Sequence, residues 1–246
     1  MTRGEPSPVL VGVFGDPVAH SLSPAMHNAA FRAVGIAGVY MKFRVPPARL
    51  GAALRAAAAL GFRGVNLTIP HKARGAALVS RLTSAARRCR SVNTITFAPG
   101  GWLGDSTDGE GFLRSLRDAW GFRARGARVV MLGAGGAARA VAFALLDAGA
   151  RELVVVNRTR ARGAALVRAL GGGRRARVQA PGTDADWADL LRGATLLVNA
   201  TSLGMRGESS PVPASAMRAP LRVVDLVYHP PVTALLRAAR RAEEFA

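Results

Sequence analysis

Cysteine, lysine and long apolar stretches are scarce in this sequence. Cys89 is the single cysteine among 246 residues, which excludes an internal disulfide and favours a reducing cytoplasm. No apolar stretch is long enough to span a bilayer, and the polar residues 1–8 lack the pattern of a secretion signal. With half of its residues apolar, the sequence predicts a cytoplasmic enzyme of one or two domains and no membrane partner.

Acidic residues are also few, since 15 Asp and Glu stand against 34 Lys and Arg and the formal net charge is +19. Such a charge is common among nucleic-acid-binding proteins, so that function has to be weighed. The basic residues are, however, spread in doublets along the whole chain rather than gathered in one segment. We interpret them as an arginine-biased surface that favours anionic small ligands, and we expect no nucleic-acid partner.

Strand-like and alanine-rich helical stretches alternate along almost the whole chain. Strands are predicted at residues 9–14, 39–45, 65–69, 93–97, 102–104, 128–132, 153–156, 196–198 and 223–227, with a further one at Val178. Helices are predicted at residues 23–34, 48–60, 136–148 and 159–170, with another from about residue 108. We expect Ser23 to cap the first helix, residues 93–97 and 102–104 to form a hairpin around residue 100, and residues 171–177 to form a surface loop. This alternation is typical of an α/β fold with helices covering the sheets. Because a fresh series starts at residue 128, we expect two α/β domains, residues 1–108 and 109–246.

A glycine-rich turn follows the predicted strand at residues 128–132. Its residues are Gly133, Ala134, Gly135, Gly136 and Ala137. Glycines here let the backbone approach a pyrophosphate, which rests on the N–H groups at the start of the next helix. Ala138 replaces the third glycine of the usual pattern and still permits close packing of helix on strand. The arrangement predicts a dinucleotide-binding Rossmann domain.

The residues after the next strand distinguish two cofactors. A site for NAD usually carries Asp or Glu here to hold the ribose hydroxyls, and this sequence has neither. The segment present here consists of Asn157, Arg158, Thr159, Arg160 and Arg162. Although arginine is abundant everywhere in the chain, guanidinium groups at this position suit a 2′-phosphate. We therefore predict NADP as the cofactor.

Four clusters of small hydrogen-bonding residues follow or end the predicted strands of the first half. They are residues 20–24, 66–72, 91–94 and 105–109. Strand ends are where α/β sheets place their sites, and converging hydroxyls and carboxamides suit a polyhydroxylated ligand. Each cluster alone has an ordinary explanation as a helix cap or Asx turn, but together they indicate a binding site.

Lys72 is unexpected in a chain that uses arginine almost everywhere. Lysine can shift its pKa and exchange a proton, whereas arginine stays charged. We therefore interpret Lys72 as catalytic, with Asp108 as its carboxylate partner, and Lys42 as an ordinary surface lysine. The four histidines show no metal-ligand spacing and no cysteine pairs exist, so no metal is expected.

These segments resemble those of the shikimate dehydrogenase family. The resemblance covers residues 9–240, and its most specific part pairs Ser-Leu-Ser-Pro at residues 21–24 with Asn-x-Thr-x-Pro-x-Lys at residues 66–72. It implies an N-terminal substrate domain and an NADP-binding Rossmann domain. The implied reaction is the NADPH-dependent, reversible reduction of 3-dehydroshikimate to shikimate, a step of aromatic amino acid (chorismate) biosynthesis, with Lys72 and Asp108 as the catalytic pair.

The resemblance also implies roles for further residues. Substrate contacts are implied for Ser21, Ser23, Asn66, Thr68, Asn93 and Tyr228. The pyrophosphate would lie at residues 133–137, the adenosine phosphate at residues 157–162, and the nicotinamide along Thr201, Ser202 and Leu226. A quinate or aminoshikimate dehydrogenase, or a catalytically impaired or regulatory member, stays open as an alternative, as does the choice between monomer and homodimer.

The departure from the family pattern is largest at residues 241–246. Family members normally continue with an Asp-Gly-x-Gly-Met segment and a helix that carries a substrate-binding Gln. We expect a chain without that segment to be less stable, and to bind substrate weakly or to be inactive.

Overall fold

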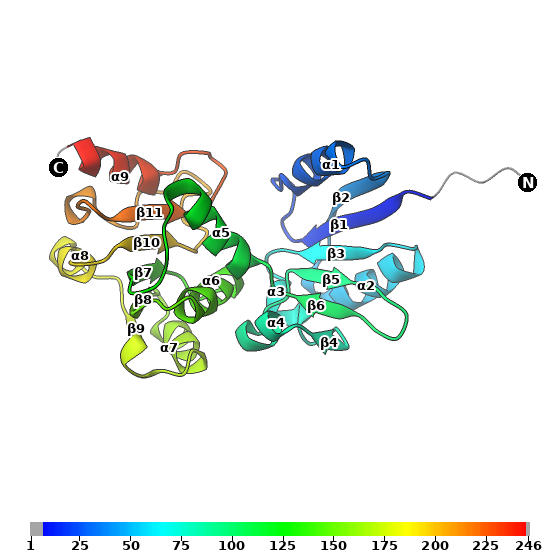
Figure 1. Ribbon diagram of the computed structural model, residues 1–246, viewed down its shortest axis with the longest axis horizontal. Coiled ribbons are helices and arrows are strands. Elements are labelled where there is room, and N and C mark those ends of the chain that lie inside the picture. Colours follow the sequence, from blue (N-terminus) through cyan, green and yellow to red (C-terminus); the bar gives the residue numbers. More distant parts are fainter. Residues whose placement is uncertain (1–6, 245–246) are drawn as a thin grey trace, which may run out of the picture. The chain divides into compact units, whose positions relative to one another are not determined.

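The computed structural model describes residues 7–244, with side chains described to residue 242 (Figure 1). The chain divides into two compact units, Met1–Thr107 and Asp108–Ala246. Within the described residues, no helix is long and apolar enough to cross a membrane, and no three His, Cys, Asp or Glu side chains group as metal ligands.

The first unit contains a mixed sheet in the order β2-β1-β3-β5-β6-β4. Its strands are β1 (Val9–Gly15), β2 (Gly38–Arg44), β3 (Gly64–Leu67), β4 (Arg81–Leu82), β5 (Thr94–Thr96) and β6 (Leu103–Asp105). The strands β2, β1 and β3 are parallel, whereas β5 runs antiparallel to both β3 and β6. The hairpin predicted around residue 100 is therefore present as β5 and β6.

Helices cover both faces of this sheet. They are α1 (Ser23–Ala33), η1 (Pro47–Arg49), α2 (Leu50–Ala59), α3 (Lys72–Gly75) and α4 (Ser84–Cys89). On one face, Leu50 and Leu54 of α2 are fully buried in the cluster that includes Ile95 of β5. On the other, Phe31 of α1 packs against Val13 of β1.

The second unit contains a fully parallel sheet in the order β11-β10-β7-β8-β9. Its strands are β7 (Arg128–Leu132), β8 (Glu152–Val156), β9 (Ala176–Gln179), β10 (Leu196–Asn199) and β11 (Arg222–Asp225). The chain runs outward from β7 to β9, then returns to β10 on the other side. Ligands of open α/β sheets bind at such a reversal, outside the carboxyl ends of the strands.

Helices flank this second sheet on both faces as well, as Figure 1 shows for α6 and α8. They are α5 (Asp108–Trp120), α6 (Gly136–Asp147), α7 (Arg160–Ala169), η2 (Gly173–Arg175), α8 (Asp184–Leu191), η3 (Ala214–Ala216) and α9 (Ala234–Glu244). Alternate residues of β7 supply the two cores: Met131 packs with α5, α6 and α7, and Val130 with α8 and α9. The predicted α/β class, with a Rossmann-like second half, is confirmed.

Three local predictions differ from the structure. The helix expected from residue 48 begins as the 3-10 turn η1, and residues 171–177, expected as a loop, contain η2 and the start of β9. Ser23 was expected to cap α1 but is its first residue. Instead the Ser21 hydroxyl accepts a hydrogen bond from the Ser23 backbone N–H at 3.3 Å, so the hydroxyl of Ser23 is available for other partners.

Candidate active site and cofactor site

Two predicted substrate-binding residues of the first unit, Asn66 and Asn93, share one hydrogen-bond network. Asn66, in β3, donates from Nδ2 to the Asn93 backbone oxygen at 3.1 Å and to Thr94 Oγ1 at 3.0 Å. Thr94 Oγ1 in turn donates to Asn93 Oδ1 at 3.1 Å. The strands β3 and β5 thereby bring Asn66 and Asn93, which are 27 residues apart in sequence, into one rigid group.

Tyr40 of β2 is a member of this network that the sequence did not reveal. Its hydroxyl donates to Asn66 Oδ1 at 2.7 Å, and burial raises the pKa of Tyr40 to about 12 against the opposing effect of a hydrogen bond with Ser23. Asn28 of α1 bonds both backbone groups of Tyr40, and the ring of His27 stacks on the phenol at 4.3 Å. In an alternating strand, an aromatic residue is more simply interpreted as core.

The Lys72 loop, by which we mean residues 68–71 together with Lys72 at the start of α3, is held at three points. The backbone oxygen of Thr68 accepts from the His71 N–H at 2.8 Å, and that of Lys72 accepts from the Val92 N–H at 2.8 Å. The buried His71 ring lies 2.8 Å from the Val45 oxygen through Nε2. Because this oxygen can only accept, Nε2 carries the proton. The loop is thus fixed beside Asn93, one residue after Val92.

Burial lowers the pKa of His71, and the nearby Arg74 acts in the same direction. The Val45 carbonyl and the negative charge of Asp16 oppose this effect but do not outweigh it. The ring is therefore neutral near pH 7 and acts as a fixed donor rather than as a charged group.

Asn93 also holds the last residue of the first unit. Its Nδ2 donates to Thr107 Oγ1 at 2.9 Å, and its Oδ1 accepts from the Thr107 N–H at 3.0 Å. The next residue, Asp108, is the first of α5 and belongs to the second unit, as does Tyr228, whose side chain is exposed. The structure therefore groups Ser21, Ser23, Asn66, Thr68, Lys72 and Asn93 in one unit.

The glycine-rich turn of the second unit has the geometry of a pyrophosphate cradle. Gly133 has φ +105°, and an added Cβ would lie 3.0 Å from the Ala200 oxygen, so a side chain is excluded on both counts. Gly135 precedes α6 and is exposed, and an added Cβ there would meet nothing within 4 Å. The space beside Gly135, the residue directly before α6, is therefore open, and the first N–H groups of a helix can bind an anion there. Ala138 is fully buried against the sheet.

The arginines after β8 surround the start of α7. Asn157 Nδ2 donates to the Thr159 oxygen at 2.7 Å and fixes the turn, and α7 begins at Arg160. Arg158, Arg160 and Arg162 are all exposed, and none forms an ion pair with a described residue. Three available guanidinium groups at a helix N-terminus form a fitting site for a phosphate.

The remaining predicted cofactor residues lie after β10 and β11. Thr201 and Ser202 follow β10, and Leu226 follows β11. The first of these loops is also held by Glu208, whose Oε2 accepts from the N–H groups of Gly204 and Arg206, both at 2.9 Å. The pKa of Glu208 is lowered, chiefly by the Arg206 N–H. All these residues lie at the carboxyl end of the parallel sheet, as does the glycine turn after β7.

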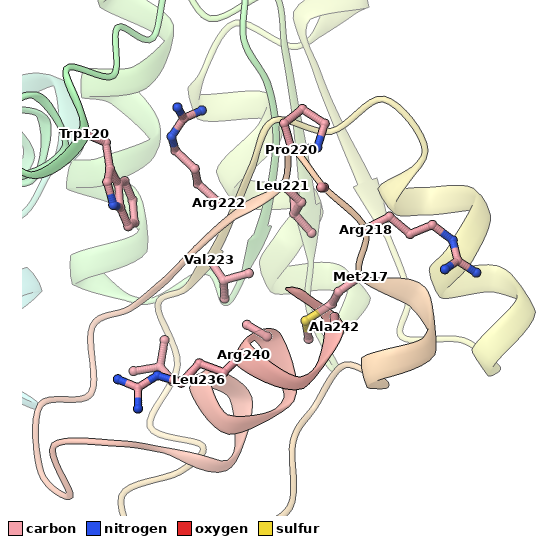
Figure 2. Close-up of a pocket in the computed structure, with 12 residues that line it drawn as sticks. Trp120, Met217, Arg218, Pro220, Leu221, Arg222, Val223, Leu236, Arg240 and Ala242 are labelled. Carbon is pink, nitrogen blue, oxygen red and sulfur yellow. The ribbon is translucent and has the colours of Figure 1, made fainter. Parts of the chain in front are cut away.

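A cavity of about 520 Å³ lies elsewhere in the second unit, along the outer edge of β11 (Figure 2). It is lined by Trp120 of α5, by Arg222 and Val223 of β11, and by Leu236 and Arg240 of α9, among others. The guanidinium of Arg222 lies over the Phe122 ring at 5.5 Å. None of the predicted site residues lines this cavity.

Two family models match the chain. Residues 13–95 match the shikimate dehydrogenase substrate binding domain, and residues 117–202 match the model described as shikimate / quinate 5-dehydrogenase. These matches fall in the first and second units respectively.

Individual relatives cover most of the chain. A shikimate dehydrogenase (NADP(+)) of Methanopyrus kandleri is 49% identical over 95% of this chain and 82% of its own length. The crystal structure of shikimate 5-dehydrogenase from Thermus thermophilus, in complex with NADP(H) and shikimate, has a TM-score of 0.83 at 40% identity, covering 95% and 84% of the two chains. Quinate dehydrogenase from Corynebacterium glutamicum, in complex with NAD, has a TM-score of 0.83 at 32% identity, covering 96% and 86%.

Proposed function

We propose that this chain, which belongs to the shikimate dehydrogenase family, catalyses the NADP-dependent, reversible reduction of 3-dehydroshikimate to shikimate in aromatic amino acid biosynthesis. The observation that carries the proposal is the connected network of Ser23, Tyr40, Asn66 and Asn93, with the Lys72 loop fixed beside it. A rigid set of hydroxyls and carboxamides next to one lysine suits a hydroxylated acid that exchanges a proton.

In this proposal residues 1–108 bind the substrate. The hydroxyls of Ser21, Ser23 and Thr68 and the carboxamides of Asn66 and Asn93 would hold its hydroxyl and carboxylate groups, together with Tyr228. Preorganisation supports these roles: Asn66 and Asn93 are already held by hydrogen bonds within the protein, so little ordering is left to occur on binding.

Lys72 and Asp108 would handle the proton at the reacting oxygen. During reduction, the Lys72 ammonium would stabilise the developing alkoxide and help to protonate it. During oxidation, the pair would accept the proton that the hydroxyl loses. The three-point fixing of the Lys72 loop supports this role, because a catalytic group must be held in place to be effective.

Residues 109–246 would bind NADP, whose reduced form would supply the hydride for the reduction and whose oxidised form would accept it in the reverse direction. The fit rests on the open space at Gly135, the start of α6 and the arginines after β8. The pyrophosphate would be held by Gly133, Ala134, Gly135, Gly136 and Ala137. The adenosine phosphate would be held by Asn157, Arg158, Thr159, Arg160 and Arg162. The nicotinamide side would be contacted by Thr201, Ser202 and Leu226. We also propose that the protein acts in the cytoplasm, which is the compartment expected for a chain with one cysteine.

Initial rates with shikimate and quinate, each with NADP⁺ and NAD⁺, test this function. We expect the highest kcat/KM for shikimate with NADP⁺. A higher value for quinate would favour the quinate alternative, to which the Corynebacterium glutamicum structure is relevant. Tight binding of NADPH without turnover of either substrate would favour a regulatory or impaired member and contradict the proposal.

A further inference from the structure

Asp225, the last residue of β11, accepts three hydrogen bonds from three segments of the second unit. Its Oδ1 accepts from Asn199 Nδ2 and from the Val227 N–H, both at 2.9 Å, and its Oδ2 accepts from Thr233 Oγ1 at 2.7 Å. These donors come from the end of β10, from the loop after β11 and from the start of α9. A carboxylate with three donors is a strong crosslink.

Asn199, the last residue of β10, is fully buried and uses all its side-chain hydrogen-bonding capacity. Its Nδ2 donates to Asp225 and also to the Leu203 oxygen at 3.0 Å. Its Oδ1 accepts from the N–H of Thr201 at 3.1 Å and from its hydroxyl at 2.7 Å. One carboxamide therefore fixes the shape of the loop that follows β10.

Thr233 links Asp225 to the N-terminus of α9. It is 1% exposed, donates to Asp225 and accepts from the Leu236 N–H at 3.3 Å, which caps α9. The loop between Asp225 and Thr233 is thereby held at both ends. That loop contains Leu226 and Tyr228. The loop after β10, which Asn199 holds in shape, contains Thr201 and Ser202.

We propose that Asn199, Asp225 and Thr233 are positioning residues that hold the loops after β10 and β11 in register with each other, and so align the nicotinamide with the substrate. The inference rests on the proposed function for the roles of Thr201, Ser202, Leu226 and Tyr228. None of the three residues need touch a ligand. They act through the two loops, whereas the pyrophosphate and adenosine parts of the cofactor are held by the turns after β7 and β8.

The variant Thr233→Val keeps the shape of the side chain but removes its hydroxyl, and Thr233→Ser keeps the hydroxyl. We expect Thr233→Val to lower kcat with shikimate by about tenfold or more, because small misplacements of reacting groups are costly, and to change the KM for NADP⁺ by less than about threefold. Thr233→Ser should restore kcat to near the unsubstituted value.

Thr183→Val is a matched control. Thr183 Oγ1 donates to Asp186 Oδ2 at 2.7 Å and caps α8, so this change also removes a threonine–aspartate bond and a helix cap. If the role of Thr233 is purely structural, both valine variants should lower Tm and leave kcat unchanged at temperatures below the thermal unfolding transition. That result would overturn the inference.

Hydrogen–deuterium exchange separates this inference from the proposed function. We expect the amides of residues 201–205 and 226–232 to exchange faster in Thr233→Val than in Thr233→Ser, and the amides of residues 133–138 to be unchanged. If shikimate is not oxidised by the unsubstituted chain, the function fails, but coupled loosening of both loops still supports the positioning role. Loosening of the second loop alone contradicts it.

Discussion

Lys72 differs from nearly every other basic residue of the chain in being able to release a proton. We predict that Lys72→Arg lowers kcat for shikimate oxidation by about a hundredfold, because the guanidinium keeps a positive charge but cannot exchange a proton near neutral pH. Steady-state kinetics measure kcat, and NADPH fluorescence titration should show an unchanged Kd.

Lys42→Arg is the matched control, since Lys42 is the other lysine. Lys42 Nζ bonds the Ala19 oxygen, an interaction that arginine can also make. The control should retain kcat within about twofold, as surface substitutions usually do. Equal activity of the two arginine variants would contradict a role for Lys72 in proton transfer.

The arginines after β8 carry the proposed choice of cofactor. We predict that Arg158→Ala raises the KM for NADP⁺ by about ten- to a hundredfold, the cost of losing a charge-assisted bond to the 2′-phosphate, and leaves the KM for NAD⁺ nearly unchanged. Arg168→Ala, at the other end of α7, is the control and should alter neither. An equal effect of Arg158→Ala on both cofactors would exclude recognition of the 2′-phosphate.

Single residues could be proposed as functional from the sequence where their chemistry was unusual for the chain. Lys72 stood out because nearly all other basic residues are arginines. Asn66 and Asn93 stood out because they belong to polar clusters at or after the ends of predicted strands. Tyr40 and Asp225 were missed because their partners, Asn66 and Thr233, come from other segments, and only the folded chain brings them together. A tyrosine in a strand and an aspartate at its end have ordinary explanations until those partners are known.

At the scale of elements, Glu152 joins three neighbouring strands. It accepts from Arg128 of β7 at 2.7 Å and from Arg177 of β9 at 3.0 Å. Burial acts to raise the pKa of Glu152, but the hydrogen bonds and charges of Arg177 and Arg128 outweigh it and lower the pKa below 4.5. A carboxyl of this kind stabilises the fold at pH values above the pKa that it has in the unfolded chain. This contribution disappears as the pH falls through the pKa that it has in the folded chain.

We therefore predict that Glu152→Gln lowers the free energy of unfolding by about 1–2 kcal/mol at pH 7, and that the difference from the unsubstituted chain shrinks below about pH 4.5. Urea unfolding at several pH values measures this difference. Asp189→Asn breaks the exposed pair with Arg192 and should have a much smaller effect. If the difference in free energy of unfolding between Glu152→Gln and the unsubstituted chain grew as the pH falls, the ionised carboxylate of Glu152 would not be its cause.

Elements with a clear apolar pattern were predictable almost to the residue. The strand β7 lies where it was expected, and α6 ends one residue earlier than expected, because continuous apolar residues followed by glycine define both. The strand β4 was missed, since Arg81–Leu82 is too short to show a period and forms only by pairing with β6. The cap of α1 and the start of α2 were misjudged because serine and proline permit more than one cap geometry.

At the scale of the whole molecule, the net charge of +19 should influence ligand affinity. NADP carries several phosphate charges, so its attraction to an arginine-rich surface is screened when the Debye length shrinks to about 10 Å at 0.1 M salt. We predict that the KM for NADP⁺ rises steadily as KCl is increased, and that the KM for shikimate, with its single carboxylate, rises less. A KM for NADP⁺ independent of salt would show that the arginines do not contribute.

The assignment of this chain as an NADP-dependent shikimate dehydrogenase is tested by the ratio of kcat/KM for shikimate with NADP⁺ to that with NAD⁺. Both values come from the appearance of reduced nicotinamide absorbance under matched conditions. We expect shikimate-dependent reduction of NADP⁺ and a ratio of at least about ten, the effect of one charge-assisted bond. No shikimate-dependent reduction, or a ratio below one, would contradict it.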